Sequence, residues 1–393
     1  MQLRKIGVIV EPIIELGRKL WDNAEPGYYE VQSEEILKKQ FISAGFKIEK
    51  FGDFPGFAAT VDGNYRSKKF ALISDMDALP LPGSEPERYI HSCGHHVQMA
   101  VLAGTALLLQ KRGLSIVDKI AFIAVPAEEY IDFEKREALR KEGRISFLSG
   151  KLELINRNVF SYPDYVISMH SAAFDKPKYI SSVLRMSGFN VMTFIFRGNA
   201  AHGGAAPHLG INAQNAASLF LQACAFLRES FNENDHIRIH PVLKLAENQP
   251  VSLIPDYAFV ETYVRGADNE AVATTVLKLR SAAEGCAKAI GAGVEITVEP
   301  GYKSFKADLQ LHSLLRETAE EEGIPFIEEE YSSASSDVGN ISQLKPTIML
   351  GLPGANGKFH NPDFRIVDEE AAYVFPARFM VKYLEKIITT LTR

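Results

Sequence analysis

The sequence predicts an α/β protein in which a main domain is interrupted by a smaller inserted domain. Helix-like and strand-like segments alternate up to residue 187, and the same style returns from residue 302, as expected for a sheet covered by helices. Between them, residues 188–301 follow the order βαββαβ, which is that of the ferredoxin-like split βαβ unit. We therefore expect one domain from residues 1–187 and 302–393, and an inserted domain from residues 188–301.

Helical and strand-like segments alternate in the first part of the chain. Apolar positions recur with helical spacing in three segments, residues 6–21, 29–44 and 97–111. Short apolar runs predict buried strands at residues 58–61, 70–73, 119–125 and 165–169. The last three runs deliver ionisable residues at their carboxyl ends. Because sites in open α/β sheets are built at that edge, we expect a functional site there.

The predicted inserted domain contains two long helices and four strands. The helices are expected at residues 211–231 and 269–290, and the strands at residues 190–197, 236–246, 257–265 and 294–298. A helix, a strand and a final helix then complete the main domain, at residues 308–322, 347–350 and 368–391. The charged stretch from Glu134 to Arg144 indicates a solvated helix face.

The composition excludes several classes of protein. Hydrophobic residues make up 46% and charged residues 23% of the chain, as in an ordinary globular protein. The net charge of −6, without a basic stripe, argues against nucleic acid as a partner. No apolar run approaches the ~20 residues that cross a bilayer, so no membrane partner is expected. Glu11 and Glu15 interrupt the segment that could pass for a signal peptide, and three cysteines imply no disulfide framework. We expect a cytoplasmic enzyme.

The densest group of chemically active residues is His91-Ser92-Cys93-Gly94-His95-His96. A thiolate together with imidazoles is the ligand set that zinc and related transition metals prefer. Cys93 and His95 lie two residues apart, so in an extended loop their side chains project to the same side. The pattern favours a metal site over structural histidines, although Cys-x-His by itself is a weak motif.

Other ionisable residues follow the predicted strands. Asp75 and Asp77 follow one strand, and a solvated turn explains this pair as well as a site does. Glu128 and Glu129 follow another strand, and two adjacent carboxylates repel one another unless a cation offsets their charge. Two further candidate ligands are histidines, His170 at a third strand end and His360 in a Gly-rich segment. Together they form the inventory of a metal site assembled from separate strand ends.

Six motifs occur in order along nearly the whole chain. They are Ser-Asp-Met-Asp-Ala-Leu-Pro (74–80), His-Ser-Cys-Gly-His (91–95), Pro-Ala-Glu-Glu (126–129), Met-His (169–170), Ala-His-Gly-Gly-Ala-Ala-Pro-His-Leu-Gly-Ile-Asn-Ala (201–213) and His-Asn-Pro-Asp-Phe (360–364). Together they resemble the metal-dependent amidohydrolases of the aminoacylase and carboxypeptidase family. The most similar branch contains auxin-conjugate hydrolases, hippurate hydrolase and aminobenzoyl-glutamate hydrolase. Asp337, within Ser335-Ser336-Asp337-Val338-Gly339, is a further candidate, and this segment is similar to the aminobenzoyl-glutamate side.

The resemblance implies a zinc-peptidase-like catalytic domain with a mixed sheet and an inserted ferredoxin-like domain that forms a homodimer. It also implies two divalent ions of zinc, manganese or nickel, with five ligands: Cys93 (bridging), His95, Glu129, His170 and His360. Glu128 would be the general base of metal-activated water, and Asp77 would orient a ligand. His202 would stabilise the oxyanion, commonly from the partner subunit in this family. Asn212 and Arg265 are weaker candidates for binding a substrate carboxylate; either fits a structural role too.

The chain departs from the family pattern beside these residues. After Cys-Gly-His the family usually has Asp and, two positions on, His, where this chain has His96 and Gln98. The Gly-rich turn that usually follows the second glutamate is replaced by Tyr130-Ile131-Asp132-Phe133 and the charged stretch. Our hypothesis is that His96 replaces an acceptor behind a ligand and changes metal selection. Equal metal content and turnover in wild type and His96→Asp would contradict it.

The leading function is hydrolysis of an amide bond in an N-acyl amino acid or small peptide-like substrate such as a dipeptide. One alternative is a homologue that binds metal but has lost turnover, which the retained Glu128 and His202 argue against. A second alternative is a hydrolase with Cys93 as the nucleophile. Full activity in a metal-free preparation would favour this second alternative over a metal-dependent enzyme.

Overall fold

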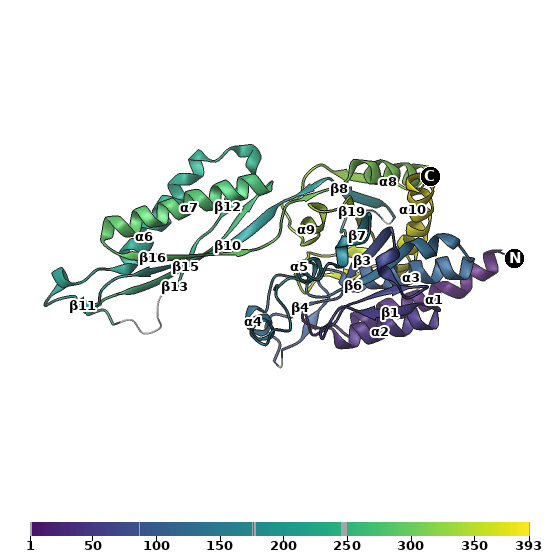
Figure 1. The fold of residues 1–393 in the computed structure, drawn as a ribbon, viewed down its shortest axis with the longest axis horizontal. Helices are drawn as coiled ribbons and strands as arrows, with labels where there is room; N and C mark the ends of the chain where they lie inside the picture. Colours follow the sequence, from purple (N-terminus) through teal and green to yellow (C-terminus); the bar gives the residue numbers. More distant parts are fainter. Residues whose placement is uncertain (1, 86, 175, 177, 245–249, 393) are drawn as a thin grey trace. The chain divides into compact units, whose positions relative to one another are not determined.

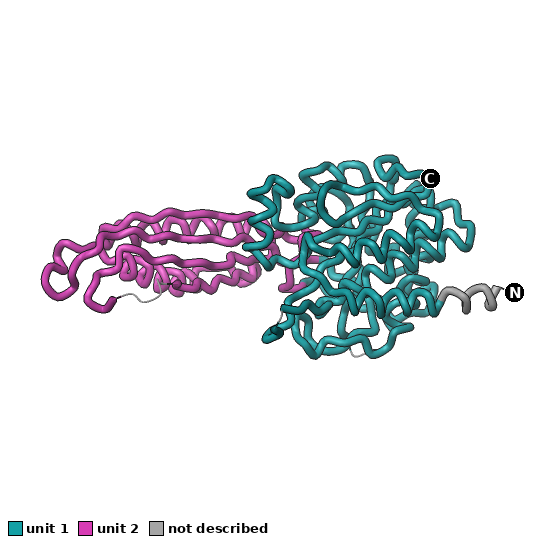
Figure 2. Tube along the Cα trace, turned by 90° about the horizontal axis from the view of Figure 1, so that it is seen from below, with its two compact units in different colours: residues 1–184, 306–331, 340–393 teal, residues 185–305, 332–339 magenta. Residues whose placement is uncertain are grey.

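The computed structural model describes residues 2–85, 87–174, 176, 178–244 and 250–392. The chain divides into two compact units (Figure 2): residues 1–184, 306–331 and 340–393 form unit 1, and residues 185–305 and 332–339 form unit 2. The predicted fold class, a mixed α/β chain with an inserted βαββαβ domain, is confirmed. The short segment 332–339 also belongs to unit 2, because Ser332 exchanges backbone hydrogen bonds with Arg185 and Ser187, at 2.9 and 3.2 Å.

Unit 1 is built on an eight-stranded mixed sheet (Figure 1). Its centre consists of four parallel strands in the order β6 (Ile120–Val125), β3 (Phe70–Asp75), β7 (Tyr165–Ser171) and β19 (Thr347–Leu352). Every residue of β3 and β6 is buried, as expected for parallel strands covered on both faces. The flanking strands are β1 (Lys47–Lys50), β2 (Phe57–Thr60), β8 (Ile180–Val183) and β18 (Phe326–Glu329).

The helix that positions the site in unit 1 is α3 (His95–Arg112), with 14 of its 18 residues buried. It packs against α1 (Gln2–Trp21) and α10 (Phe375–Leu391), and a Cβ at Gly104 would come within 3.1 Å of Ile13 and 3.2 Å of Ala377. Gly104 therefore allows the three helices to approach closely. Unit 1 also contains α2 (Val31–Ser43), α4 (Phe133–Lys141), α5 (Gly150–Asn156) and α8 (Leu309–Glu321), while α9 (Val338–Ser342) starts in the segment 332–339 and ends in unit 1.

Unit 2 has the ferredoxin-like order of elements. Its antiparallel strands are arranged β12 (Arg238–Ile239), β15 (Tyr257–Gly266), β10 (Gly188–Arg197), β16 (Gly293–Pro300), with β13 (Val242–Lys244) also paired to β15. Helices α6 (Ala213–Leu227) and α7 (Asn269–Ile290) pack on this sheet, and Cys224 and Cys286 are buried in the shared core. No helix in the described part of the chain has the length and apolar character needed to cross a membrane.

Three predicted elements differ in detail from the structure. The strand expected at residues 236–246 is divided into β12 and β13 at Pro241, which has no N–H to donate to the sheet; residues 245–246 lie outside the described residues. The final helix starts with a π-helical turn, Glu370–Val374, before α10. The charged stretch does form helix α4, but the prediction of a solvated face is wrong for Arg136, which is completely buried.

Candidate metal centre

Side chains of metal-ligand type converge in unit 1 from separate parts of the chain. Within each of three overlapping groups, the potential ligand atoms all lie within 4.8 Å of one another: Cys93, His95 and His170; Cys93, Glu129 and His360; His95, Glu128 and Glu129. These six residues are the five predicted ligands and the predicted base. The structure therefore brings these six residues together, whereas the motif at residues 201–213 lies in unit 2.

Close backbone packing brings these segments together. Gly94 precedes α3 in the left-handed region, with φ of 80°, and a Cβ there would lie 2.1 Å from Ser171 Oγ, which follows His170 in β7. A side chain at Gly94 would thus push α3 away from β7. The backbone N–H of His360 donates to the carbonyl of Ser92 at 3.0 Å, which holds the C-terminal loop beside Cys93.

Hydrogen bonds fix which ring nitrogen of two histidines faces the centre. His95 donates through Nδ1 to Asp77, whose backbone oxygen lies at 2.8 Å and whose Oδ1 lies at 3.1 Å. His170 donates through Nδ1 to the carbonyl of Ser171 at 2.7 Å. In the neutral ring the lone pair then lies on Nε2, which is the atom that would ligate a metal. His170 Nε2 lies 3.2 Å from Cys93 Sγ, and His95 Nε2 lies 3.9 Å from Glu128 Oε2.

Among the residues that the structure describes, two buried polar atoms of this cluster have no hydrogen-bond partner, His95 Nε2 and Glu129 Oε1. Glu129 Oε1 forms an ion pair with His360 Nε2, at 3.3 Å. Unpartnered buried polar atoms are costly, and a cation would satisfy both of these. A thiolate, imidazoles and carboxylates are also the donors that zinc and its neighbours take. The residues present therefore fit divalent metal ions.

The electrostatics of the cluster favour the same interpretation. Burial, and then the charge of Glu129, raise the pKa of the Cys93 thiol well above its ordinary value. Burial acts to raise the pKa of Asp77 as well, but its hydrogen bond to His95 and the charge of Arg136 bring it below the ordinary value. Asp77 thus remains a carboxylate behind His95. A cation is needed to bring Cys93 to the thiolate form.

The two aspartates after β3 have different surroundings. Asp77 accepts hydrogen bonds from His95 and, through Oδ2, from the backbone N–H of Glu129 at 2.9 Å. Asp75 instead pairs with the fully buried Lys151, and its backbone N–H donates to Gln98 Oε1 at 3.0 Å. Asp75 does not belong to any of the three ligand groups found among the described residues.

His96 packs among aromatic rings. Its ring centroid lies 4.8 Å from that of Trp21 and 5.9 Å from that of Tyr373. Both nitrogens are buried and have no hydrogen-bond partner in the described part of the chain, and burial holds the pKa of this imidazole well below its ordinary value. No hydrogen bond between His96 and a predicted ligand is found among the described residues, so the hypothesis that His96 accepts from a ligand has no support from this geometry.

Four predicted residues lie in unit 2. His202, on β11 (Ala201–His202), is exposed and accepts hydrogen bonds at Nδ1 from Gly204 and Ala205, at 3.2 and 3.0 Å. The side chain of Asn212 caps α6 by accepting the N–H of Asn215 at 3.0 Å. Arg265 donates to the carbonyl of Ser333 at 2.9 Å, within the unit. Asp337 is completely buried.

Sequence reasoning missed two buried ionisable residues beside the site, Glu30 and Arg136. Glu30 accepts the N–H of Ala127 at 2.7 Å, and Ala127, with φ of 53°, directly precedes Glu128. Nothing local marks Glu30 in the sequence. The signal for Arg136 was the apolar Leu139 three residues later, because both residues lie on one face of α4 and both are buried.

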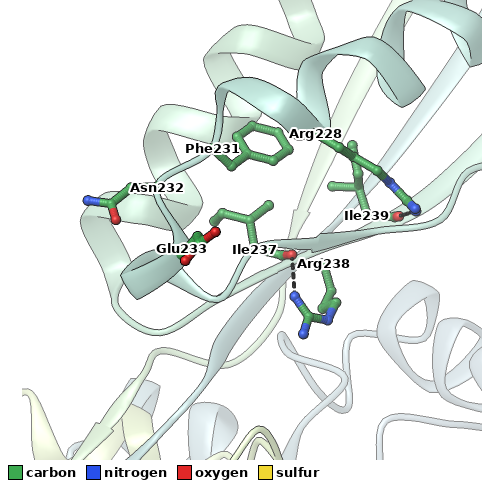
Figure 3. A pocket seen from close by; sticks show the side chains of 7 residues that line it. All are labelled: Arg228, Phe231, Asn232, Glu233, Ile237, Arg238 and Ile239. Carbon is green, nitrogen blue, oxygen red and sulfur yellow. Dashed lines mark hydrogen bonds between the residues drawn. The ribbon is translucent and has the colours of Figure 1, made fainter.

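A separate cavity of about 310 Å³ lies in unit 2, between the end of α6 and β12 (Figure 3). Its two arginines donate to backbone carbonyls: Arg228 to Ile239 at 2.6 Å and Arg238 to Ile237 at 2.9 Å. None of the residues that line it is a predicted site residue.

The sequence pattern of peptidase family M20/M25/M40 matches residues 71–386, which include every residue of the metal cluster. The chain belongs to this family. Membership confirms the predicted family and enzyme class, a metal-dependent hydrolase of the amidohydrolase and peptidase type.

Individual proteins match this M20/M25/M40 chain over most of its length. N-acetylcysteine deacetylase of Bacillus subtilis is 23% identical, with 92% of this chain and 93% of that protein covered. Hippurate hydrolase of Campylobacter jejuni is also 23% identical, with coverages of 94% and 96%. The crystal structure of a dinuclear metal-binding peptidase of the M20 family from Bacillus subtilis superposes with a TM-score of 0.74 at 21% identity, covering 98% and 100% of the two chains.

Proposed function

We propose that this chain hydrolyses the amide bond of an N-acyl amino acid or small peptide-like substrate at a centre of two divalent ions. The observation that carries the proposal is the set of three overlapping ligand groups, which together offer a thiol, three imidazoles and two carboxylates. The similarity to N-acetylcysteine deacetylase and hippurate hydrolase supports the substrate class, and the similarity to a dinuclear metal-binding peptidase supports two ions.

We assign the metal ligands as Cys93, His95, Glu129, His170 and His360. Cys93 would hold metal together with His170 in one ligand group and with His360 in another, and His95 and Glu129 likewise each belong to two of the groups. When bound, the ions polarise the scissile carbonyl and lower the pKa of water, which is the chemistry that side chains alone do not supply. The proposal leaves the choice among zinc, manganese and nickel to direct metal analysis.

Glu128 is assigned as the general base. Its carboxylate is buried beside the ligands, with Oε2 3.9 Å from His95 Nε2. In this role it takes the proton of the attacking water and returns it to the leaving amine. Asp77 orients His95 through its hydrogen bond to Nδ1, so that Nε2 faces the centre.

His202 is assigned to the developing oxyanion. Because its Nδ1 accepts two backbone N–H groups, its proton resides on Nε2, which can donate to a negatively charged oxygen. Asn212 and Arg265 are the candidates for binding a substrate carboxylate. We infer that unit 2 mediates a homodimer and that His202 acts in the partner subunit's site. Mixing His202→Ala with Glu128→Gln protomers should then restore part of the activity, and no recovery would contradict sharing between subunits.

A substrate screen tests the function itself. Purified enzyme is assayed against N-acyl amino acids and dipeptides after chelation and after addition of zinc, manganese or nickel. We expect no hydrolysis without metal and recovery with at least one ion. Activity that survives chelation and is lost in Cys93→Ser would instead identify a cysteine nucleophile. Metal binding without hydrolysis of any substrate would indicate a homologue that has lost turnover.

We also propose that the enzyme is cytoplasmic, because a metal ligand such as Cys93 has to stay reduced and thiols stay reduced in the cytoplasm.

A further inference from the structure

Arg136 is a fully buried cation beside the metal cluster. It lies in α4, within the segment that departs from the family pattern after Glu129. Its Nη1 donates to the carbonyl of Leu148 at 2.8 Å, and its Nη2 lies 3.8 Å from Asp77 Oδ2. Burying a guanidinium is costly unless charge and hydrogen bonds compensate, so a buried arginine at this position calls for a specific explanation.

The packing around the guanidinium leaves little room for movement. A Cβ at Gly27 would lie 2.4 Å from Arg136 Nη2 and 2.9 Å from the Cα of Ala127. The ring of Tyr28 lies on another side, with its centroid 5.9 Å from the guanidinium carbon. Arg136 is therefore held in one position, between the loop that precedes α2 and the loop that carries Glu128 and Glu129.

Asp77 connects this cation to the predicted metal ligands. One carboxylate oxygen, Oδ1, accepts from His95 at 3.1 Å, and the other, Oδ2, accepts the backbone N–H of Glu129 at 2.9 Å. Arg136 approaches Oδ2, the same oxygen that holds Glu129. Rotation of the Asp77 carboxylate would disturb both ligands at once, and the nearby cation opposes that rotation.

We propose that Arg136 is a positioning residue of the metal centre, which fixes Asp77 so that His95 and Glu129 are both held for metal binding. The inference rests on the proposed function, since it assumes that His95 and Glu129 are ligands. The α4 segment then has a role of its own, which is to supply the buried cation that lies next to Asp77.

Electrostatics and positioning predict opposite results when the charge is removed. A positive charge near the site repels divalent cations, so if Arg136 acted only as a charge, its removal would strengthen metal binding. If Arg136 positions Asp77, its removal weakens metal binding, since groups behind metal ligands typically contribute about 10- to 100-fold in affinity. The direction of the change therefore separates the two roles.

The experiment is titration of the metal-free full-length protein with zinc ions alone, read by calorimetry, for wild type, Arg136→Met and Arg136→Lys. We expect Arg136→Met to bind zinc about 10- to 100-fold more weakly. Arg136→Lys should lie between the two, because a lysine keeps the charge but lacks the planar guanidinium that donates to Leu148 while placing Nη2 3.8 Å from Asp77 Oδ2. Arg140→Met, on the same helix but with a partly exposed side chain, is the matched control and should bind as wild type does.

Unchanged or tighter binding in Arg136→Met overturns the proposal. If Arg136→Met does not fold, Arg136→Lys decides: weaker binding supports positioning, and wild-type binding overturns it.

A double-mutant cycle tests whether the effect passes through Asp77. In the Asp77→Asn background, Arg136→Met should change zinc affinity by less than about threefold, since the group it acts on has already been altered. A full loss in that background would show that Arg136 acts by another route and would overturn the proposal. Zinc affinity is measured without substrate. If the four zinc affinities follow the expected pattern but the enzyme hydrolyses no substrate, the proposed function is contradicted and the positioning role of Arg136 is not.

Discussion

The sheets of the two units differ in how their strands are buried. In unit 1, all residues of β3 and β6 are buried, as in parallel strands with cover on both faces. In unit 2, β15 alternates strictly between buried and more exposed residues after its first position, as in an antiparallel sheet covered on one face. Figure 1 shows α6 and α7 along the unit 2 sheet, and both helices contact it.

This difference explains where each unit carries polar side chains. A strand buried on both faces tolerates ionisable residues only near its ends, so five of the six clustered residues of unit 1 lie near the ends of β6 and β7 and at the start of α3. The sixth, His360, comes from the loop between β20 (Ala355–Asn356) and β21 (Arg365–Ile366). In unit 2 the half-exposed strands carry polar residues along their length. His202 lies on the short strand β11, outside the main sheet. Substitutions at the strand ends of unit 1 should therefore affect chemistry, and truncation of core residues in unit 2 should affect stability.

The largest effect expected is on chemistry in unit 1. Glu128→Gln should lower the rate of hydrolysis about 10²- to 10⁴-fold, because the base is lost, while metal content stays that of wild type. Turnover with each substrate and metal content by mass spectrometry check this. Glu87→Gln, an exposed glutamate of the same unit paired with Lys135, is the control. Loss of metal together with activity would show that Glu128 is a ligand rather than the base.

A core truncation in unit 2 should act on stability instead. Phe194 on β10 is completely buried, and its ring centroid lies 4.5 Å from that of Phe220. Phe194→Ala should lower the free energy of unfolding of unit 2 by about 3–5 kcal/mol, measured by hydrogen exchange of its strands. Val242→Ala, at a half-exposed position of β13, should cost far less. A lower zinc affinity of unit 1 in Phe194→Ala would contradict the expectation that a core truncation in unit 2 leaves the metal site of unit 1 unaffected.

Metal removal should distinguish the units in a single experiment. Free metal at one hundred times its dissociation constant stabilises the state that binds it by about 2.7 kcal/mol. Chelation should therefore speed hydrogen exchange in β3, β6 and β7 of unit 1 and leave β10 and β15 of unit 2 unchanged. The same loss of protection in both units would mean that they unfold together.

The last expected effect is pH-dependent and concerns the buried carboxyl of Glu30. Burial, and then the charge of Asp77, raise its pKa well above the ordinary value. The folded chain thus keeps a proton that the unfolded chain releases above pH ~4.5, so this group's contribution to stability falls by up to about 1.4 kcal/mol for each pH unit up to the folded pKa. Glu30→Gln keeps an oxygen for the Ala127 N–H and has no proton to lose, so it should remove this decline.

Denaturant unfolding from pH 4.5 to 8 measures the Glu30 contribution. Relative to wild type, Glu30→Gln should gain stability as the pH rises, and the exposed Glu320→Gln should not. A constant difference between Glu30→Gln and wild type across this range would contradict the shifted pKa.

Much of the fold could be predicted from the sequence because its signals are local. Apolar runs identified β3, β6 and β7, and the order of elements identified the ferredoxin-like unit. The residues that meet in the metal cluster were also predicted, since a thiol and several histidines close to strand ends are an unusual combination with a chemical reason. The boundary at residues 332–339 carried no such signal, because it depends on pairing with Arg185 and Ser187.

The sequence by itself determined which side chains are able to bind metal and at which strand ends they occur. Only the tertiary structure decided which partner each neighbouring charged residue has and which of these residues are buried. It separates Asp75, paired with Lys151, from Asp77, which faces His95, although the two look alike in the sequence. It also buries Arg136 within a stretch that looks solvated. The physical reason is that the cost of a charge depends on the groups around it, and distant segments of the chain supply those groups.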